Sequence, residues 1–402
     1  MNWRKPLIFA GLYLTGSKIP KYLKEIKRIE KLPQEEIKKY QEEKLKKLLL
    51  HAYCNVPYYR KILPKSGVIK NGKVYLENFD KIPILTKEII RKEGTNLYSK
   101  DYKSRKPYEN TSGGSTGEPV KFIQDKEYDE WNIATKIYYN QMLGKEIGEK
   151  EIKFWGSERD IFKGNIGFKN KIFNFIYNRN LVNSFRLNFV GLNKAIDSWN
   201  RFKPKIVWSY VDSAYELSRH IEKNKINIFS PEAIIVTAGV LTENIRKYVE
   251  DTFQTEVYNQ YGSREVGVVA CECKAHEGLH IFEYFQYLEL INSDKNRNGE
   301  IIITNLTNYS MPLIRYRIGD TAKIKNKKCS CGRGFKLLEN VTGRITDHFI
   351  KKDGTIVHGE YFTHLFYFKD WIKKFQVIQK DYNLIVCSIV LEKDKSKCYA
   401  NT

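Results

Sequence analysis

Residues that could do chemistry concentrate in a few short segments, and the richest is 111–119. It reads Thr-Ser-Gly-Gly-Ser-Thr-Gly-Glu-Pro, which combines three glycines with two serines and two threonines. Glycines let the backbone approach a ligand and turn its amides inward, and the hydroxyls add further donors. Such a loop can wrap nucleotide phosphates, although it lacks the Gly-Lys-Ser/Thr ending of a P-loop. Taken alone, the segment fits a flexible surface turn equally well.

Cysteine and histidine residues form a second candidate site. Two Cys-x-Cys pairs, Cys271/Cys273 and Cys329/Cys331, accompany His276 and His280. Thiolates and imidazoles suit a tetrahedral structural zinc, and reduced, unligated cysteines are the alternative. A disulfide framework is not expected in a cytoplasmic chain. The remaining cysteines are isolated and fit ordinary thiols: Cys54, Cys387 and Cys398.

An alternation of strands and helices in the middle of the chain would position these segments. We expect strands at 206–210, 233–236 and 256–258, separated by a helix at 213–223 and by a second helix that Thr242 caps. This alternation favours a parallel sheet with helices on its faces, which binds ligands beyond the carboxyl ends of its strands. Two glycine-containing loops are expected there, at Ala238-Gly239 and Tyr261-Gly262.

The flanking regions complete an α/β fold. Residues 1–100 are predicted to be mainly helical, with an exposed amphipathic helix at 34–50 and a helix capped by Thr86. After Gly299, a more antiparallel, strand-rich subdomain is expected. We therefore predict a large N-terminal domain over 1–343, with parallel or mixed sheets flanked by helices. A short, incomplete α+β C-terminal domain would follow over 344–402.

Composition and charge restrict the partners. Hydrophobic residues make up 42% of the chain, which is typical of a globular protein, and the formal charge is +22. The lysines are spread along the sequence, which favours a solvated basic surface over a nucleic-acid footprint. One stretch, Lys18–Arg28, has basic residues around a short apolar segment and is a candidate for peripheral contact with an anionic membrane. We read neither a signal peptide nor a transmembrane helix and expect a cytoplasmic location.

Four motifs in order resemble the adenylate-forming superfamily of acyl-CoA synthetases, peptide-synthetase adenylation domains and luciferases. They are the 111–119 loop, Tyr261–Glu265, Tyr316–Asp320 and Gly343–Asp347. The finer resemblance is to the phenylacetate–CoA ligase-like branch and its CapK-type proteins, which are linked to capsular polysaccharide synthesis. It is carried by Ser112–Pro119, Gly278–His280, Thr304–Leu306, Pro312–Tyr316 and Cys329–Arg333.

The resemblance implies a role for each motif residue. Ser112, Ser115, Thr116 and Gly117, in one loop with Gly113 and Gly114, would hold the β- and γ-phosphates of ATP. Ala238 and Gly239 would leave room for adenine, and Tyr261, followed by Gly262 and Ser263, would stack on it. Glu265 would coordinate magnesium, Asp320 would bind the ribose hydroxyls, and Arg344 would lie near the ribose and phosphate. Thr116, Glu265 and Arg344 would be the catalytic residues.

The same resemblance selects Cys273, His280, Cys329 and Cys331 as the zinc ligands, with Cys271 in reserve.

The implied reaction is activation of a small carboxylic acid as an acyl-adenylate, followed by displacement of AMP by a thiol or an amine, with coenzyme A as one candidate acceptor. The stretch after Arg344 is short for a complete C-terminal domain, and it has no recognisable context for the family's catalytic lysine. Two alternatives therefore stay open: a non-catalytic nucleotide-binding protein and an aryl-acid CoA ligase. The sequence names neither the acid nor the acceptor, and it leaves the oligomeric state open.

Overall fold

Helices occupy most of residues 1–100 in the computed structural model. The structure describes residues 2–112, 120–156, 168–184, 189–293, 298–342, 348–352, 356–358, 362, 365–366 and 371–391. The N-terminal helices are α1 (Arg4–Leu14), α2 (Ile19–Ile29), α3 (Gln34–Asn55), α4 (Pro57–Lys65) and α5 (Lys87–Glu93). A short hairpin, β1 (Ile69–Lys70) and β2 (Lys73–Val74), and three 3-10 turns at 76–81, 94–97 and 102–105 connect them.

The helix predicted at 34–50 is α3, which extends to Asn55 and is less exposed than its charge suggested. Its apolar stripe is completely buried, at Ile37, Leu45, Leu48 and Leu49. The cap predicted at Thr86 is confirmed, because the Thr86 hydroxyl accepts a hydrogen bond from the Ile89 amide at 3.4 Å, at the start of α5. Such a bond satisfies one of the amides that have no partner inside the helix.

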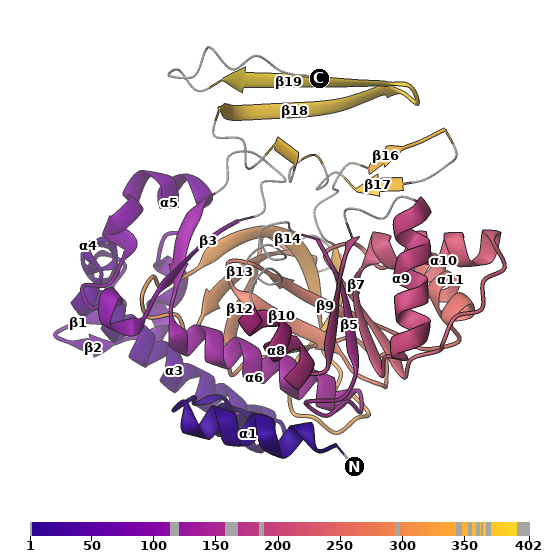
Figure 1. The fold of residues 1–402 in the computed structure, drawn as a ribbon. Helices are drawn as coiled ribbons and strands as arrows, with labels where there is room; N and C mark the ends of the chain where they lie inside the picture. Colours follow the sequence, from indigo (N-terminus) through magenta and orange to yellow (C-terminus); the bar gives the residue numbers. More distant parts are fainter. Residues whose placement is uncertain are drawn as a thin grey trace.

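One large mixed sheet organises the described part of the chain (Figure 1). Eleven strands lie in the order β12-β13-β14-β15-β11-β10-β9-β8-β7-β5-β6. The parallel half contains β5 (Glu151–Trp155), β6 (Arg179–Asn183), β7 (Ile206–Tyr210), β8 (Ala233–Thr237) and β9 (Val257–Ser263). The antiparallel half contains β10 (Gly267–Glu272), β11 (Leu279–Ile281), β12 (Gln286–Ile291), β13 (Gly299–Asn305), β14 (Tyr316–Lys325) and β15 (Leu337–Thr342).

Helices cover both faces of the parallel half, so its interior strand β8 is buried along its whole length. Successive side chains of a strand point to opposite faces. Accordingly, Ile234 and Val236 pack in the core under α9 (Phe189–Phe202), α10 (Val211–Lys223) and α11 (Glu243–Phe253). Ala233 and Ile235 pack in a second core with α2 and α6 (Lys126–Met142). A third core joins α3 and α4 to the antiparallel half.

The predicted strands and helices of the middle region are confirmed, with one correction. The strand at 206–210 is β7, and Thr242 caps α11 by accepting from the Ile245 amide at 3.3 Å. However, Tyr261-Gly262 is not a loop. Strand β9 continues through Ser263, because β10 returns beside it and pairs with residues 260–263.

The strand-rich region after Gly299 is antiparallel, as predicted, and it is continuous with the parallel half. The change of direction occurs between β9 and β10, which are antiparallel neighbours. Strands from both regions therefore form a single surface, on which side chains far apart in the sequence can meet.

The C-terminal region carries two short two-stranded sheets. They are β16 (His348–Ile350) with β17 (Ile356–His358), and β18 (Ile372–Asp381) with β19 (Leu384–Leu391). The side chain of Gln379 joins them through bonds of 2.8 and 2.6 Å to the backbone of Ile350. In Figure 1 the β18–β19 hairpin lies on the opposite side of the molecule from α1.

The stretch Lys18–Arg28, a sequence candidate for membrane contact, largely forms α2. Its apolar side chains are buried, including Tyr22, Leu23 and Ile26, and Tyr22 stacks on Trp131 of α6. Only the exposed basic side chains of this stretch, including Lys21, Lys24 and Lys27, are free to contact a membrane surface, and peripheral contact stays a prediction. Among the described residues, no helix combines the length and apolar composition needed to cross a bilayer.

A buried carboxylate ties together the amino ends of β5 and β6. Glu151 is almost completely buried, and its oxygens lie 3.0 Å from Lys145 Nζ, 3.3 Å from Lys153 Nζ and 2.9 Å from Arg179 Nε. Burial opposes ionisation, but the neighbouring cations outweigh it and hold the pKa of Glu151 well below its ordinary value. Removing the carboxylate would leave buried positive charge without compensation.

We expect Glu151→Gln to lower the free energy of unfolding by about 3 kcal/mol at pH 7. Because the pKa of Glu151 is lowered in the folded state, its contribution is complete above the unfolded pKa of about 4.3 and is lost as the pH falls through the folded value. Urea unfolding across this pH range measures both effects. Glu36→Gln, at an exposed pair with Lys39, is the control and should change stability by less than about 0.5 kcal/mol. Equal effects of the two substitutions would contradict the role of Glu151.

Candidate functional site

A small hairpin presents the two ends of the glycine-rich loop. Strands β3 (Tyr108–Thr111) and β4 (Lys121–Gln124) pair antiparallel on either side of it. Ser112 is buried, its amide donates to the Val120 carbonyl at 3.0 Å, and its hydroxyl accepts from the Val120 amide at 2.9 Å. The ends of the loop are thus closed by residues that the structure describes. Five predicted phosphate-binding residues lie outside the described residues, as does Arg344: Gly113, Gly114, Ser115, Thr116 and Gly117.

The hairpin is attached to the segment that carries Glu265. Gln124, at the end of β4, is buried, and its side-chain amide donates to the carbonyls of Arg264 and Glu265 at 2.8 and 3.1 Å. Asn110 of β3 donates to the Gln124 side-chain oxygen at 3.1 Å and completes this contact. Sequence reasoning missed Gln124, because an isolated glutamine after a short strand carries no motif.

Two tyrosine–carboxylate hydrogen bonds join the Tyr261–Glu265 motif to the Tyr316–Asp320 motif. The Tyr261 hydroxyl donates to Asp320 Oδ2 at 2.8 Å, and the Tyr316 hydroxyl donates to Glu265 Oε1 at 3.2 Å. Each motif therefore supplies one tyrosine and one carboxylate. Glu265 and Tyr316 are buried, whereas Tyr261 and Asp320 are half-buried and border the surface. The structure brings together Tyr261, Glu265 and Asp320 from two separate parts of the chain.

This contact requires a curved sheet. Between β9, which carries Tyr261, and β14, which carries Asp320, lie the strands β10, β11 and β15. In a flat sheet the two strands would be about 19 Å apart, too far for one hydrogen bond to join their side chains. The sheet therefore bends so that both strands face the same space. Part of the support comes from Leu85, whose amide donates to the Arg315 carbonyl at 2.9 Å and whose carbonyl accepts from the Arg317 amide at 3.0 Å.

Arg315, which precedes Tyr316, anchors this motif and was not assigned a role from the sequence. It is buried, pairs with Glu289 at 3.0 Å, and donates to the carbonyls of Asp80 and Ile82. The signal that could have identified it is its place in the Pro312–Tyr316 motif. Its partners Asp80 and Ile82 were not predictable, because they lie 235 and 233 positions earlier in the chain.

The predicted adenine-binding residues lie at the carboxyl end of β8. Ala238 has a positive φ of 56°, an uncommon backbone conformation for a residue with a side chain. Gly239 lies against Val211, and a Cβ there would approach the Val211 Cβ to 3.0 Å. The neighbouring strand ends carry Trp155 and Tyr210, whose rings are 4.9 Å apart. Between these two residues, 157–167 and 185–188 lie outside the described residues.

Gly262 and Ser263 lie between Tyr261 and Glu265 and shape the end of β9. A Cβ on Gly262 would collide with the Gly267 carbonyl oxygen, so the close approach of β9 and β10 requires glycine. The Ser263 hydroxyl accepts from the Val266 amide at 3.4 Å within the turn between the two strands. In this structure both residues shape the turn that carries Glu265.

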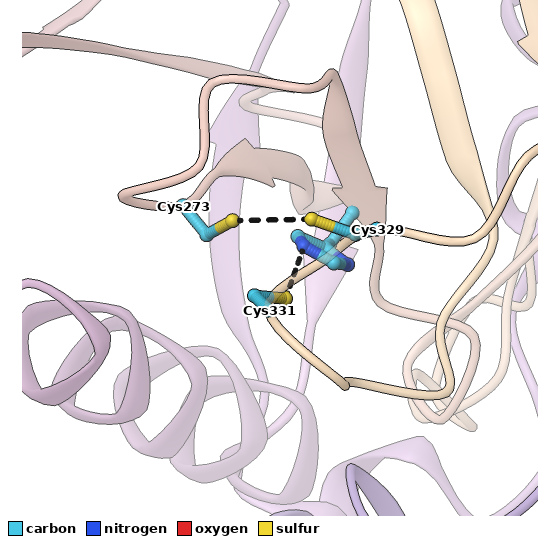
Figure 2. A group of neighbouring side chains, drawn as sticks. Cys273, Cys329 and Cys331 are labelled. Atoms are coloured by element: carbon cyan, nitrogen blue, oxygen red, sulfur yellow. Dashed lines mark hydrogen bonds between the residues drawn. The ribbon is translucent and has the colours of Figure 1, made fainter.

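The four predicted zinc ligands come together. Side-chain donor atoms of Cys273, His280, Cys329 and Cys331 all lie within 4.8 Å of one another. Figure 2 shows the three cysteines facing a common centre, with Cys273 Sγ 3.6 Å from Cys329 Sγ and Cys331 Sγ 3.3 Å from His280 Nε2. A disulfide would require sulfurs about 2.05 Å apart. Tetrahedral zinc, with bonds of about 2.3 Å to sulfur and 2.0 Å to nitrogen, separates its ligands by roughly 3.5–3.8 Å. The four residues therefore fit a zinc ion.

Strand pairing explains why these residues meet. Cys273 directly follows β10, His280 lies on β11, and Cys329 and Cys331 lie in the connection between β14 and β15. Strand β11 pairs with both β10 and β15. Gly278 permits this, because a Cβ there would lie 2.6 Å from the Leu338 carbonyl oxygen. The connection is also fixed by Glu277, whose carboxylate accepts from the Ser330 amide at 2.9 Å.

Cys331 and His280 shift each other's ionisation, and the proton held by His280 would have to leave before its ring could bind a metal. Burial opposes a thiolate at Cys331, but the His280 ring and Arg333 together outweigh it and lower the pKa of Cys331 to about 5. Burial likewise opposes a charged His280, yet its bonds to Cys273 and Cys331 raise the pKa of His280 to about 9. A thiolate is the form of cysteine that binds metals.

Two further candidates lie outside the cluster. His276 stacks on Tyr258, with ring centroids 4.7 Å apart, and its Nδ1 lies 3.5 Å from Glu272. Cys271, held in reserve as a ligand, is a buried core residue, and burial raises the pKa of its thiol.

Comparisons with known proteins agree with this architecture. A family model described as the CapK C-terminal domain matches residues 349–400. Protein CapK of Staphylococcus aureus is 25% identical over 387 residues, which cover 94% of this chain and 83% of CapK. The phenylacetate–coenzyme A ligase of Thermus thermophilus is 25% identical over 346 residues, which cover 80% of this chain and 73% of that enzyme.

Solved structures of coenzyme A ligases have a fold similar to that of this chain. A 2-hydroxyisobutyryl-CoA ligase in complex with 2-HIB-AMP and CoA superposes with a TM-score of 0.66 at 16% identity, covering 90% of this chain and 80% of that one. An open conformation of a 2-hydroxyisobutyryl-CoA ligase gives a TM-score of 0.64. The chain thus has the fold of adenylate-forming ligases and is homologous to coenzyme A ligases. Its sequence is similar to CapK and to phenylacetate–coenzyme A ligases, and its fold is that of adenylate-forming ligases.

Proposed function

We propose that this protein activates a small carboxylic acid with ATP, as an acyl-adenylate, and transfers the acyl group to a thiol or an amine. The observation that carries the proposal is the pair of tyrosine–carboxylate bonds, Tyr261–Asp320 and Tyr316–Glu265, on a segment that Gln124 fastens to the hairpin of the glycine-rich loop. Homology to coenzyme A ligases supports it independently.

The residues present suit ATP and magnesium. Glu265 offers a buried carboxylate oxygen, a ligand that magnesium prefers, and magnesium would neutralise phosphate charge there. Asp320, held by the Tyr261 hydroxyl, would accept hydrogen bonds from ribose hydroxyls, and the Tyr261 ring would pack against adenine. Ser112 closes the base of the loop that we assign to the phosphates. Thr116 and Arg344 stay assigned to the reacting phosphates as a prediction from the motifs.

The proposed chemistry has two steps. In the first, a carboxylate oxygen of the acid forms a bond to the α-phosphorus, and the bond from that phosphorus to pyrophosphate breaks. In the second, a thiol or amine attacks the acyl carbon, loses its proton to solvent or a base, and releases AMP. Holding the reactants in place supplies much of the acceleration of such transfers.

The similar proteins suggest candidates for the acceptor and for the acid. A 2-hydroxyisobutyryl-CoA ligase of similar fold binds CoA, which makes coenzyme A our first candidate acceptor. Four curated relatives of this chain are phenylacetate–coenzyme A ligases, which favours the second candidate function, ligation of an aryl acid. A role in cell-surface polysaccharide synthesis and a cytoplasmic location stay predictions from the sequence.

We expect Glu265→Gln to reduce magnesium-dependent ATP–pyrophosphate exchange by about a hundredfold or more. The amide keeps an oxygen that can accept from Tyr316 but removes the charge that would hold magnesium. Glu283→Gln is the matched control, since Glu283 is equally buried in the same protein and its partners are Gln34 and Lys336. The control should retain full magnesium-dependent exchange. If Glu265→Gln retains it as well, the assignment of Glu265 is wrong.

The exchange assay on the unmodified protein separates the candidate functions. It should be run with a panel of aliphatic, hydroxy and aryl acids, followed by measurement of AMP release with and without coenzyme A. Exchange with an aryl acid and coenzyme A-dependent AMP release favour the aryl-acid ligase. ATP binding without exchange for any acid favours a non-catalytic nucleotide-binding protein.

We also propose that Cys273, His280, Cys329 and Cys331 hold a structural zinc ion. Four protein ligands in a mostly buried cluster leave no open position for a substrate, which distinguishes structural zinc from catalytic zinc. Bound there, zinc would fasten the β14–β15 connection to the β10–β11 turn. This strengthens the part of the sheet that lies between Tyr261 and Asp320.

Protein purified from zinc-supplemented medium should contain about one zinc per chain by elemental analysis. Cys329→Ser should remove most of this zinc and lower the melting temperature, because binding to the folded state stabilises it. Cys54→Ser, at an exposed thiol outside the cluster, should leave both values unchanged. A zinc content that is the same in both variants would contradict the site.

A further inference from the structure

The exposed residues of helix α1 carry no charge, and its charged residues, Arg4 and Lys5, are half-buried. Every exposed residue between Trp3 and Leu14 is apolar or aromatic, or is glycine: Trp3, Pro6, Leu7, Ala10, Gly11, Tyr13 and Leu14. Leu14 is 88% exposed, Tyr13 68% and Trp3 52%, so at least half of each of these residues is open to solvent. An ordinary surface helix turns its polar side outward. The composition of α1 therefore indicates that something apolar covers this face.

Helix α8 (Phe168–Ile176) enlarges the apolar surface. Its Ile172, Phe173 and Phe175 are exposed, and Phe175 is 64% exposed. Arg4 connects the two helices, because its Nε donates to the Phe175 carbonyl at 3.2 Å and its guanidinium lies over the rings of Trp3 and Phe175 at 4.5 and 5.2 Å. Together these side chains form one patch, the α1–α8 face.

The charge of the protein favours an anionic lipid surface over a second copy of the chain as the partner of this face. The chain carries a formal charge of +22, so two copies would repel each other as they approached. Helix α2, which follows α1 after a short turn, exposes Lys21, Lys24 and Lys27 while burying its apolar side. Exposed Trp, Tyr, Phe and Leu beside basic residues match the boundary between acyl chains and anionic headgroups.

We propose that the α1–α8 face docks this protein on an anionic lipid surface. Leu7, Leu14 and Phe175 enter the acyl-chain boundary, and Trp3 and Tyr13 lie at headgroup level. Arg4, held between two aromatic rings, contacts lipid phosphate. The basic residues of α2 add attraction without inserting. This docking is independent of the ligase activity proposed above, since its residues belong to none of the motifs assigned to ATP.

Flotation of the full-length protein with vesicles tests the proposal. The protein should float with vesicles of equal parts phosphatidylglycerol and phosphatidylcholine, bind pure phosphatidylcholine far less, and lose binding as salt rises. The double substitution Leu7→Ser, Leu14→Ser should weaken the partition constant by about tenfold or more, since each leucine loses its apolar burial. Phe175→Ser should weaken it through the other helix.

The control removes exposed apolar side chains elsewhere on the molecule. Leu384→Ser and Val390→Ser lie on the exposed β18–β19 hairpin, on the opposite side of the molecule in Figure 1, and should leave flotation unchanged. No flotation of the unmodified protein, or equal binding by the α1 and hairpin variants, would overturn the proposal. So would light scattering that shows a dimer in the unmodified protein and a monomer in the α1 variant, because a second copy would then cover the face.

Discussion

The curvature of one sheet is the constraint on which the candidate site depends. The sheet is parallel up to β9 and antiparallel beyond it, and it bends until β14 faces β9 across three intervening strands. Only this bend lets Tyr261 reach Asp320 and Tyr316 reach Glu265. Each bond uses a hydroxyl and a carboxylate, and charge-assisted bonds of this kind are stronger than neutral ones. They join the two motifs that carry the proposed magnesium and ribose ligands.

Buried polar residues to which the sequence assigned no role hold the motifs in place. Arg315 fastens the start of β14 to the 80–82 segment, and Gln124 fastens the loop hairpin to Glu265. Leaving any of these buried groups without a partner would cost more than the bond itself contributes. This asymmetry explains how a few side chains can specify one relative position for elements that are distant in the sequence.

The cysteine–histidine cluster lies on the strands that separate the two halves of the site. Its residues come from the ends of β10, from β11 and from the connection before β15, the same strands that lie between β9 and β14. A metal ion there would limit the relative movement of these strands. In this arrangement the proposed structural zinc would support the proposed nucleotide site without touching it. Helix α1, in contrast, lies on the opposite side of the molecule from the C-terminal hairpin. Its apolar face is proposed to bind a lipid surface and has no part in the proposed chemistry.

The sequence alone determined what depends on local patterns. Short β-branched runs and capping threonines located β7, β8, α5 and α11, because strand burial and helix capping are set by neighbouring residues. Ordered motifs selected Glu265, Asp320 and the four cluster residues, because these side chains are rarely grouped by chance. Only the tertiary structure decided the rest. It placed Tyr261 and Gly262 inside a strand, since the partner that extends β9 comes later in the chain. It buried the apolar side of α2 and exposed that of α1, although both stretches contain apolar residues. The reason is that α2 packs against α6, a helix that is distant in the sequence. It also supplied Gln124, Arg315 and Glu151, whose roles exist only through partners brought near by the bend and by the pairing of strands.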